Sequence, residues 1–446
     1  MKTLQAGDSR VSKIIQSSKI DLTSMYRPSQ FLYSYSDKNG HCLYNTLSKT
    51  VIQLSDEEWN IFLEIKQNGM NGEDLSRHAF AQLAKMRFLV PDETDDFKLY
   101  GQVITLLRTM SFKSQPGLKQ YTILPTTFCN ARCVYCFEEG MKFQTMSTDT
   151  AERVVEFIDR THMSGQPCRL IWFGGEPLVA QRIISHICQK LTAREIAYTS
   201  ELVTNAMLFD AEIIKTAKEL WHVDCIQVSV DGNREDYEKR KAYISPTIHN
   251  YDKLFTVLSL LLKENFKVVL RCNYDEKNLN GMKEFIDEIY NKLGNPKNLA
   301  IYFGMLIQIL EMRSSVEVYN KVHDLMRYLD KKGMSHKITP SCHQLQSYFC
   351  MADSRRSIII NSDGSLQRCE TVSVSPIVGN IGDKESPSLP ESSPFTAPEK
   401  CRTCCFLPHC TTFRKENCPT TSKYCDEFNC ITYDYFLEKQ LLAKLE

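Results

Sequence analysis

Three closely spaced cysteines are the residues of this sequence whose type and spacing most directly suggest chemistry. Cys129, Cys133 and Cys136 follow an apolar, strand-like run in a Cys-x3-Cys-x2-Cys pattern. Three thiolates are one ligand short of the four that close a structural zinc site or a fully ligated iron–sulfur cluster, so the metal that they hold keeps one open position. An open iron can bind a ligand that reacts. The alternative is a zinc knuckle that a distant residue completes.

The cysteines must be positioned by the surrounding chain, and strand-like runs alternate there with helix-like runs. Candidate strands span residues 121–127, 169–173, 200–204, 226–230, 266–271 and 299–306, and candidate helices span residues 150–160, 181–192, 211–220, 251–263, 281–293 and 316–332. Six β/α units of this kind predict an α/β fold, a partial (β/α)6 TIM-like barrel. Ligands of such folds bind at the carboxyl ends of the strands.

Polar clusters occur at the predicted strand ends. The first strand leads to the cysteines, and the next four end in Gly-Gly-Glu-Pro at 174–177, Thr-Asn-Ala at 204–206, Ser-Val-Asp-Gly at 229–232 and Arg-Cys-Asn at 271–273. Glycines let the backbone approach a ligand closely, and carboxylate or carbonyl oxygens accept hydrogen bonds from an ammonium group. Each cluster alone is usually a turn. Together and in this order they predict one site.

The cysteine spacing, with the aromatic Tyr135 just before the third cysteine, resembles the motif of the radical S-adenosylmethionine (SAM) family. The resemblance implies a [4Fe-4S] cluster on the three cysteines and SAM as a second cofactor. It places the methionyl amino group at residues 174–177 and the carboxylate and ribose near the fourth and fifth strands. The SAM-binding residues expected in this way are Tyr135, Gly174, Gly175, Glu176, Thr204, Asn205, Ser229, Asp231, Arg240, Arg271 and Asn273.

One departure from the family pattern lies just before Arg240, where Asp236 and Tyr237 replace the expected histidine and aspartate. Related peptide maturases have His-Asp-x-x-Arg after the Asp-Gly, whereas this sequence reads Asp-Tyr-Glu-Lys-Arg at 236–240. The arginine remains, and it could pair with the methionyl carboxylate in the bidentate fashion that guanidinium favours.

The resemblance also implies a reaction. SAM chelates the open iron, an electron from the cluster cleaves the sulfonium bond, and the resulting 5′-deoxyadenosyl radical abstracts a hydrogen atom from an unactivated carbon. The protein supplies orientation and excludes water.

A second group of cysteines lies toward the C-terminus. An Asn-Ser-Asp-Gly turn at 361–364 predicts a hairpin, 357–360 with 365–368, that leads to Cys369. The pattern resembles the SPASM extension, which binds two auxiliary [4Fe-4S] clusters. The resemblance implies Cys342, Cys350, Cys369 and Cys418 for the first, and Cys401, Cys404, Cys410 and Cys430, with Cys425 as the alternative, for the second.

Two points about these ligands stay open. Arg414 stands where the family has a further cysteine, so the roles of Cys418, Cys425 and Cys430 are not assigned uniquely. If Cys342 is not a ligand, the first auxiliary cluster has an open iron that could bind a substrate thiolate. A zinc ribbon on Cys401, Cys404, Cys410 and Cys418 is the alternative.

The N-terminal part predicts a small winged-helix-like module. Asn39-Gly40 joins two β-prone runs, 31–35 and 41–47, as a hairpin, Ser55-x-x-Glu58 opens a helix through Ile65, and a second helix is expected over 72–86. The layout resembles the leader-recognition module of peptide maturases, in which a precursor's leader adds a strand to a sheet edge. A stabilising cap without a ligand is the alternative.

Length and composition limit the remaining possibilities. The 446 residues divide into residues 1–105 (the module), 118–335 (the barrel) and 336–446 (the SPASM domain). Lys plus Arg equals Asp plus Glu at 54 each, so no overall charge draws the chain to nucleic acid or an anionic membrane. No signal peptide or membrane helix is evident, which predicts a cytoplasmic protein. Its 18 cysteines are then not expected to form disulfides, and the clustering of many of them favours metal binding.

The sequence therefore predicts a radical SAM oxidoreductase that matures a ribosomally synthesised precursor peptide by an oxidative crosslink, a thioether, C–C or C–O bond. An electron donor such as flavodoxin or ferredoxin is the expected second partner. The alternative enzyme is an anaerobic sulfatase maturase that forms formylglycine, with Glu370 in place of the expected catalytic aspartate. A non-catalytic zinc-binding scaffold is the third hypothesis.

Overall fold

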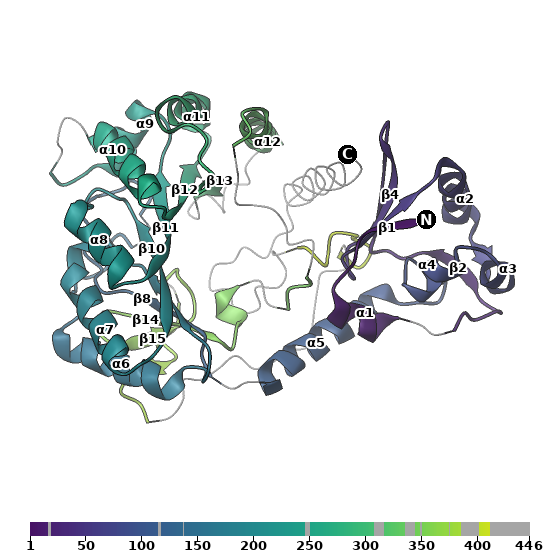
Figure 1. Ribbon diagram of the computed structural model, residues 1–446, viewed down its shortest axis with the longest axis horizontal. Helices are drawn as coiled ribbons and strands as arrows, with labels where there is room; N and C mark the ends of the chain where they lie inside the picture. Colours follow the sequence, from purple (N-terminus) through teal and green to yellow (C-terminus); the bar gives the residue numbers. More distant parts are fainter. Residues whose placement is uncertain are drawn as a thin grey trace.

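The computed structural model describes residues 1–16, 19–114, 117–136, 138–245, 250–306, 316–334, 344–347, 350–373, 375–384 and 401–410. Four expected ligands, Cys342, Cys418, Cys425 and Cys430, lie outside these ranges. An α/β part occupies the left of Figure 1 and an N-terminal module the right, with segments of the cysteine-rich region between them.

The α/β part is built on a nine-stranded sheet with the order β13-β12-β11-β10-β9-β8-β14-β15-β16. The first six strands in this order are parallel to their neighbours, which confirms the six predicted units. Their bounds are β8 (Gln120–Ile123), β9 (Cys168–Trp172), β10 (Tyr198–Thr204), β11 (Val223–Val230), β12 (Lys267–Tyr274) and β13 (Leu299–Met305).

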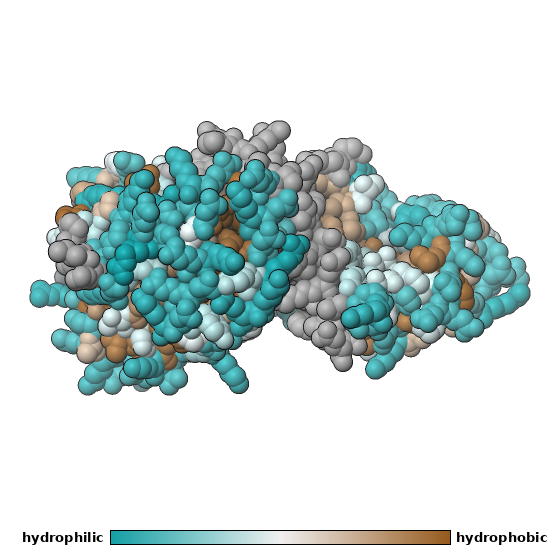
Figure 2. Space-filling model, turned by 90° about the horizontal axis from the view of Figure 1, so that it is seen from above, coloured by the Kyte–Doolittle hydropathy of each residue, from teal (hydrophilic) through white to brown (hydrophobic). Residues whose placement is uncertain are grey.

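Helices cover the outer face of this sheet (Figure 1). Their bounds are α6 (Thr148–Thr161), η1 (Pro177–Ala180), α7 (Gln181–Ala193), α8 (Ala211–Glu219), α9 (Arg234–Lys241), α10 (Asn250–Lys263), α11 (Leu279–Leu293) and α12 (Val316–Lys331). Helix α6 shows why they form: Ser147 accepts a hydrogen bond from Thr150 N as its N-cap, and Val154, Val155 and Ile158 turn one apolar face to the core. Figure 2 shows the hydrophilic residues on the outside of this part.

The inner face of the sheet differs from the outer face. Along β10, fully buried residues alternate with half-buried ones, as a strand with one face on the core and one on a more open region requires. Trp172 and Trp221 are both 0% exposed in the core between sheet and helices. The half-buried face is therefore the one available to a ligand.

The C-terminal hairpin joins the same sheet. Strands β14 (Ser357–Ile360) and β15 (Ser365–Gln367) form the predicted hairpin around the 361–364 turn, and β16 (Gly379–Asn380) pairs with β15. Unexpectedly, β14 runs parallel to β8, with Ile358 opposite Tyr121. The hairpin that leads to Cys369 thus joins the sheet next to β8, the strand that leads to Cys129, with β14 between β8 and β15.

The N-terminal module contains two small sheets. Strands β1 (Lys2–Gln5), β5 (Thr50–Leu54), β4 (Gly40–Asn45) and β3 (Leu32–Asp37) form one, in that order. Strands β6 (Met70–Asn71), β2 (Met25–Pro28) and β7 (Leu89–Pro91) form the other. The hairpin at Asn39-Gly40 and the capping box of Ser55 and Glu58 are both confirmed. Strands β1, β2 and β5 had not been predicted.

The module's helices are α1 (Ser9–Ile15), α2 (Asp56–Asn68), α3 (Gly72–Arg77), α4 (Ala81–Lys85) and α5 (Asp96–Ser114). The prediction of a single helix over 72–86 was wrong, because the helix is interrupted between α3 and α4. There His78 Nδ1 accepts a hydrogen bond from Phe80 N at 3.1 Å, and the turn buries the Phe80 ring completely. Within the described residues, no helix has the length and apolarity needed to cross a membrane.

Candidate active site at the carboxyl ends of the strands

The cysteine loop follows β8 and is held by backbone contacts to the chain around α9. Ile244 N donates to Asn130 O at 2.9 Å and Val134 N donates to Arg240 O at 3.1 Å. These bonds place Cys129, Cys133 and Cys136 at the edge of the sheet where β11 and β9 also end.

Burial sets the electrostatics of these thiols. It raises the pKa of Cys129 to about 12, and the neighbouring Glu176, Cys133 and Cys136 add to the shift. Burial likewise raises the pKa of Cys136. Such thiols ionise only when a cation compensates the charge, and a bound metal does this. The soft donor set therefore fits an iron–sulfur cluster. In the described part of the chain, no three His, Cys, Asp or Glu side chains already enclose a metal position.

The Gly-Gly-Glu segment connects the second and third strands to this loop. Glu176 is 0% exposed; it accepts hydrogen bonds from Thr204 Oγ1 at 2.7 Å and Asn205 N at 2.8 Å. Desolvation raises the pKa of Glu176, and the bonds from Asn205 and Thr204 oppose this shift. Asn205 Nδ2 in turn lies 3.9 Å from Cys129 Sγ. Glu176, Thr204 and Asn205 thus form one connected support beside Cys129.

Gly175 leaves no room for a side chain. A Cβ there would lie 2.4 Å from the Phe128 carbonyl oxygen and 2.6 Å from its carbon, directly before Cys129. We expect Gly175→Ala to displace this backbone at a cost of about 1–3 kcal/mol and to weaken SAM binding, measured by equilibrium dialysis. Gly382→Ala is the control, because its Cβ would have no neighbour closer than 3.4 Å. Equal affinity in the two variants would contradict the prediction.

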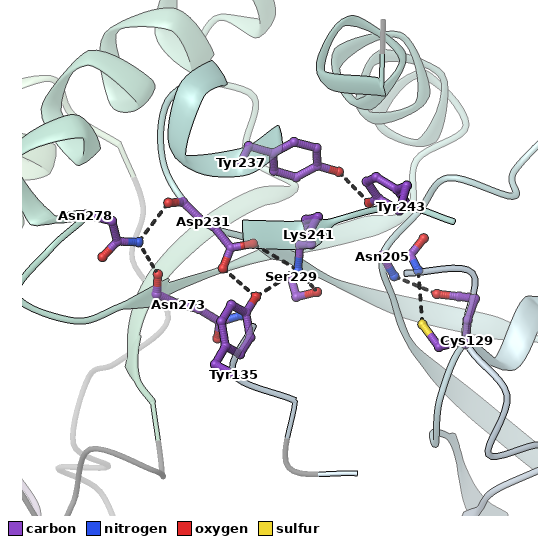
Figure 3. Close-up of polar contacts among 11 residues, drawn as sticks. Cys129, Tyr135, Asn205, Ser229, Asp231, Tyr237, Lys241, Tyr243, Asn273 and Asn278 are labelled. Atoms are coloured by element: carbon purple, nitrogen blue, oxygen red, sulfur yellow. Dashed lines mark hydrogen bonds and ion pairs between the residues drawn. The ribbon is translucent and has the colours of Figure 1, made fainter. Parts of the chain in front are cut away.

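A second polar cluster lies across the strand ends (Figure 3). Tyr135 OH donates to Asp231 Oδ1 and accepts from Asn273 Nδ2 at 3.1 Å. Lys241 Nζ lies 3.0 Å from Ser229 Oγ, 3.2 Å from Tyr135 OH and 3.2 Å from Asp231 Oδ2. The structure therefore brings together four of the expected SAM-binding residues and adds Lys241.

Lys241 was not recognised in the sequence, although Arg240 beside it was. Lys241 is 2% exposed, and Asp231 is the main group that raises its pKa well above the usual value against the effect of burial. Arg240 instead pairs with Asp275 at 2.8 Å while its guanidinium lies 5.4 Å from the centre of the Tyr135 ring. The cation at the centre of the cluster is therefore Lys241.

Arg271 lies on the inner face of the nine-stranded sheet, apart from the polar cluster around Lys241. A Cβ on Gly304 would come within 2.8 Å of Arg271 Nε, so the glycine makes space for the arginine side chain. Tyr302, which pairs with Arg271 in the strand register, donates to Gln227 Oε1 at 2.9 Å. These residues form a polar wall below the strand ends.

Glu370 faces the same region. Its side chain is solvent-exposed, yet desolvation raises its pKa, with the charge of Arg271 opposing the shift. Glu370 follows Cys369, whose Sγ accepts a hydrogen bond from Thr371 N at 3.5 Å.

The cysteines that were expected to hold the auxiliary clusters, where the structure describes them, lie in two places. Cys350 and Cys369 flank the β14–β15 hairpin and are half-buried. Cys401, Cys404 and Cys410 lie in the separate 401–410 segment, which contacts the N-terminal module.

Comparisons with known proteins agree with this geometry. Residues 123–289 match the Radical SAM superfamily. An uncharacterized protein of Methanocaldococcus jannaschii is 22% identical over 281 residues, 62% of this chain and 93% of the relative. The Fe-coproporphyrin III synthase of Methanosarcina barkeri is 26% identical over 223 residues, 48% of this chain and 53% of the synthase.

Among solved structures, native anSMEcpe with bound AdoMet (SAM) superposes with a TM-score of 0.57 at 17% identity, over 73% of this chain and 98% of that one. This likeness supports the fold. Enzymes of the superfamily use a [4Fe-4S] cluster and SAM, and the hypothesis of a non-catalytic scaffold does not hold. Residues 123–289 form a radical SAM domain, and the protein that contains it is an enzyme.

Proposed function

We propose that this enzyme is a peptide maturase that forms an oxidative crosslink, a thioether, C–C or C–O bond, in a ribosomally synthesised precursor. The observation that carries the proposal is the pairing of β14 with β8. It brings the hairpin that leads to Cys369 into the sheet of the radical SAM domain, and Glu370 lies near Arg271 on the inner face, so that a second redox centre would lie close to the substrate.

The chain's own residues have distinct parts in binding SAM. Cys129, Cys133 and Cys136 would hold the [4Fe-4S] cluster, which when bound would supply an electron for the reductive cleavage of SAM. Lys241 offers a buried ammonium to the methionyl carboxylate. Glu176 holds the ends of β9 and β10 together.

Two auxiliary [4Fe-4S] clusters complete the proposal. Cys342, Cys350, Cys369 and Cys418 would hold one, and Cys401, Cys404, Cys410 and Cys430 or Cys425 the other. A crosslink formed after loss of a hydrogen atom requires the removal of one more electron, which such a cluster can accept. A cytoplasmic donor such as flavodoxin or ferredoxin would reduce the enzyme.

The N-terminal module, residues 1–105, would bind the leader of the precursor. Its four-stranded sheet ends at β3. An extended peptide placed beside an outer strand gains main-chain hydrogen bonds along its length. Residues 118–335 and 336–446 would form the catalytic and auxiliary-cluster domains.

The test uses a short peptide encoded beside the gene, incubated with reduced enzyme and SAM under anaerobic conditions. The proposal predicts a product lighter by two hydrogen atoms, whose fragmentation shows an internal link. An unchanged peptide mass together with oxidation of a sulfatase fragment would contradict it.

Formylglycine formation is the second candidate, favoured by the position of Glu370 directly after Cys369. Its product contains an aldehyde, which a hydrazide reagent traps, whereas the crosslink gives no such adduct. Hydrazide labelling of the product therefore separates the two candidates.

Glu370→Gln tests a proton-accepting role in either reaction. We expect product formation to fall by roughly 10²-fold or more, since a carboxylate base contributes on that scale, while 5′-deoxyadenosine is still released. Because the pKa of Glu370 is raised, the wild-type rate should increase with pH as the carboxylate ionises. Glu370→Asp should keep part of the activity. Equal loss of peptide product in both variants would argue against this role.

A further inference from the structure

Arg271 is a charged residue on the inner face of the sheet that has no direct partner in the described part of the chain. Its side chain is half-buried, and its guanidinium makes neither a hydrogen bond nor an ion pair with any described residue. The Nε atom is also shielded from solvent. A guanidinium donor without an acceptor costs free energy, so this group is suited to a partner that comes from outside the chain.

The fold fixes where this guanidinium lies. A Cβ on Gly304 would come within 2.8 Å of Arg271 Nε and 3.3 Å of its Cγ, so the arginine lies across the neighbouring strand β13. Asn273, two residues further along β12, donates to Tyr135 OH at 3.1 Å (Figure 3). Residues two apart on a strand share one face at a distance of about 7 Å. Arg271 therefore lies one step from the polar cluster around Lys241.

A second donor lies beside Arg271. Tyr302, the register partner of Arg271, donates to Gln227 Oε1 at 2.9 Å, and Gln227 is only 9% exposed. Gln227 itself pairs with Val269, two residues before Arg271. With Oε1 engaged, the amide nitrogen Nε2 keeps its N–H donors, and no described residue accepts from it. Two sets of donors thus face the same region from neighbouring strands.

The nearby carboxylates leave this guanidinium without a contact. Glu201 is paired with Arg169, whose Nη2 lies 3.1 Å from Glu201 Oε2. Glu370 is close enough for the charge of Arg271 to oppose the rise in its pKa, but it forms no ion pair with Arg271. The planar fork of Arg271 therefore remains open to an acceptor with two oxygens, and a carboxylate is the group that matches it in bidentate fashion.

We propose that Arg271, with Gln227 beside it, binds a carboxylate of the peptide substrate and is a specificity-determining residue. The carboxylate belongs to an Asp or Glu side chain or to the end of the peptide chain. The inference rests on the proposed function, because it takes the substrate to be a peptide. It adds which chemical group of that peptide the inner face recognises, and it assigns Arg271 to the substrate instead of to SAM.

The experiment measures the binding of three short peptides to the full chain, reconstituted anaerobically and saturated with SAM. The probes are acetyl-Ala-Ala-Glu-Ala-Ala-amide, its Gln analogue, and acetylated penta-alanine with a free terminal carboxylate. One of the two charged probes should bind at least about tenfold more tightly than the neutral Gln probe in an NMR titration. The probe that does so shows whether the side chain or the chain end supplies the carboxylate.

Variants test whether this preference depends on Arg271. Arg271→Met should remove it, whereas Arg271→Lys should keep part of it because the charge remains. Gly304→Ala changes no charge, yet its Cβ would displace the guanidinium, so the preference should also fall. Arg194→Met is the control, because Arg194 at the end of α7 pairs with Asp159 at 2.9 Å.

The outcomes separate this inference from the proposed function. Equal or undetectable binding of charged and neutral probes overturns the inference, as does a charge preference that survives Arg271→Met. A greater loss of SAM affinity in Arg271→Met than in Lys241→Met also overturns it and places Arg271 in the SAM site. A charge preference that depends on Arg271, together with no crosslink in any peptide, supports the carboxylate site and contradicts the proposed function alone.

Chemical labelling of the unsubstituted chain covers the case in which Arg271→Met does not fold. Phenylglyoxal adds to guanidinium groups, and the labelled arginines are identified by mass spectrometry after digestion. The charged probe that binds more tightly should protect Arg271 from labelling but should not protect Arg194, and the neutral probe should protect neither. Labelling of Arg271 that is equally fast with and without the charged probe would contradict the inference.

Discussion

Replacing Cys129, Cys133 and Cys136 together by alanine should abolish SAM cleavage and lower the iron content from about twelve to about eight atoms per chain. The three thiols lie on one loop, and the cluster in this family pattern has only these three protein ligands, so their joint removal is expected to abolish it. Iron is measured after anaerobic reconstitution, and 5′-deoxyadenosine is measured by chromatography.

The matched control removes three cysteines that the proposal does not use. Cys168, Cys188 and Cys272 are at most 2% exposed and belong to the main hydrophobic core. Their replacement by alanine should destabilise the fold moderately, because it removes buried sulfur atoms, but should leave both iron and SAM cleavage intact. Loss of iron from the control, or its retention in the triple variant, would contradict the assignment.

Lys241→Met should have the second largest effect. It removes the ammonium that contacts Ser229, Tyr135 and Asp231, and it leaves the Asp231 carboxylate buried at 0% exposure without its cation. Breaking such a pair costs about 3–5 kcal/mol. That cost reduces stability; SAM affinity and cleavage should fall by roughly 10²-fold, because loss of a buried charge that pairs with the ligand's carboxylate costs about 2–5 kcal/mol of binding free energy.

Two further variants separate binding from folding. Lys241→Arg keeps the charge and should bind SAM better than Lys241→Met. Arg240→Met should have a smaller effect on SAM affinity, because Arg240 is committed to Asp275. SAM affinity is measured by calorimetry and stability by chemical unfolding. A greater loss of SAM affinity in Arg240→Met than in Lys241→Met would instead indicate that Arg240 binds the methionyl carboxylate.

The sequence predicted the strands and helices of the α/β part and two features of the N-terminal module, because their signals are local. The alternation of strands and helices, the Asn39-Gly40 turn and the Ser55 capping box each depend on residues a few positions apart. The strand-end clusters followed from the same pattern, since parallel strands present their carboxyl ends at one edge. Tyr135, Ser229, Asp231 and Asn273 do lie together.

What the sequence did not predict depends on distant partners. Lys241 stands in a charged stretch that is typical of a solvent-exposed surface, and its pairing with Asp231 offsets the cost of its burial. Lys49 contacts His409 from 360 positions away. The pairing of β14 with β8 likewise has no local signal, because either strand alone would fit an ordinary hairpin or barrel edge.

The most direct test of the central claim is the formation of 5′-deoxyadenosine. The wild-type enzyme is reconstituted with iron and sulfide, reduced with dithionite and incubated with SAM in the absence of oxygen. The account predicts release of 5′-deoxyadenosine that depends on Cys129, Cys133 and Cys136. A protein that binds stoichiometric zinc and releases no 5′-deoxyadenosine would contradict it.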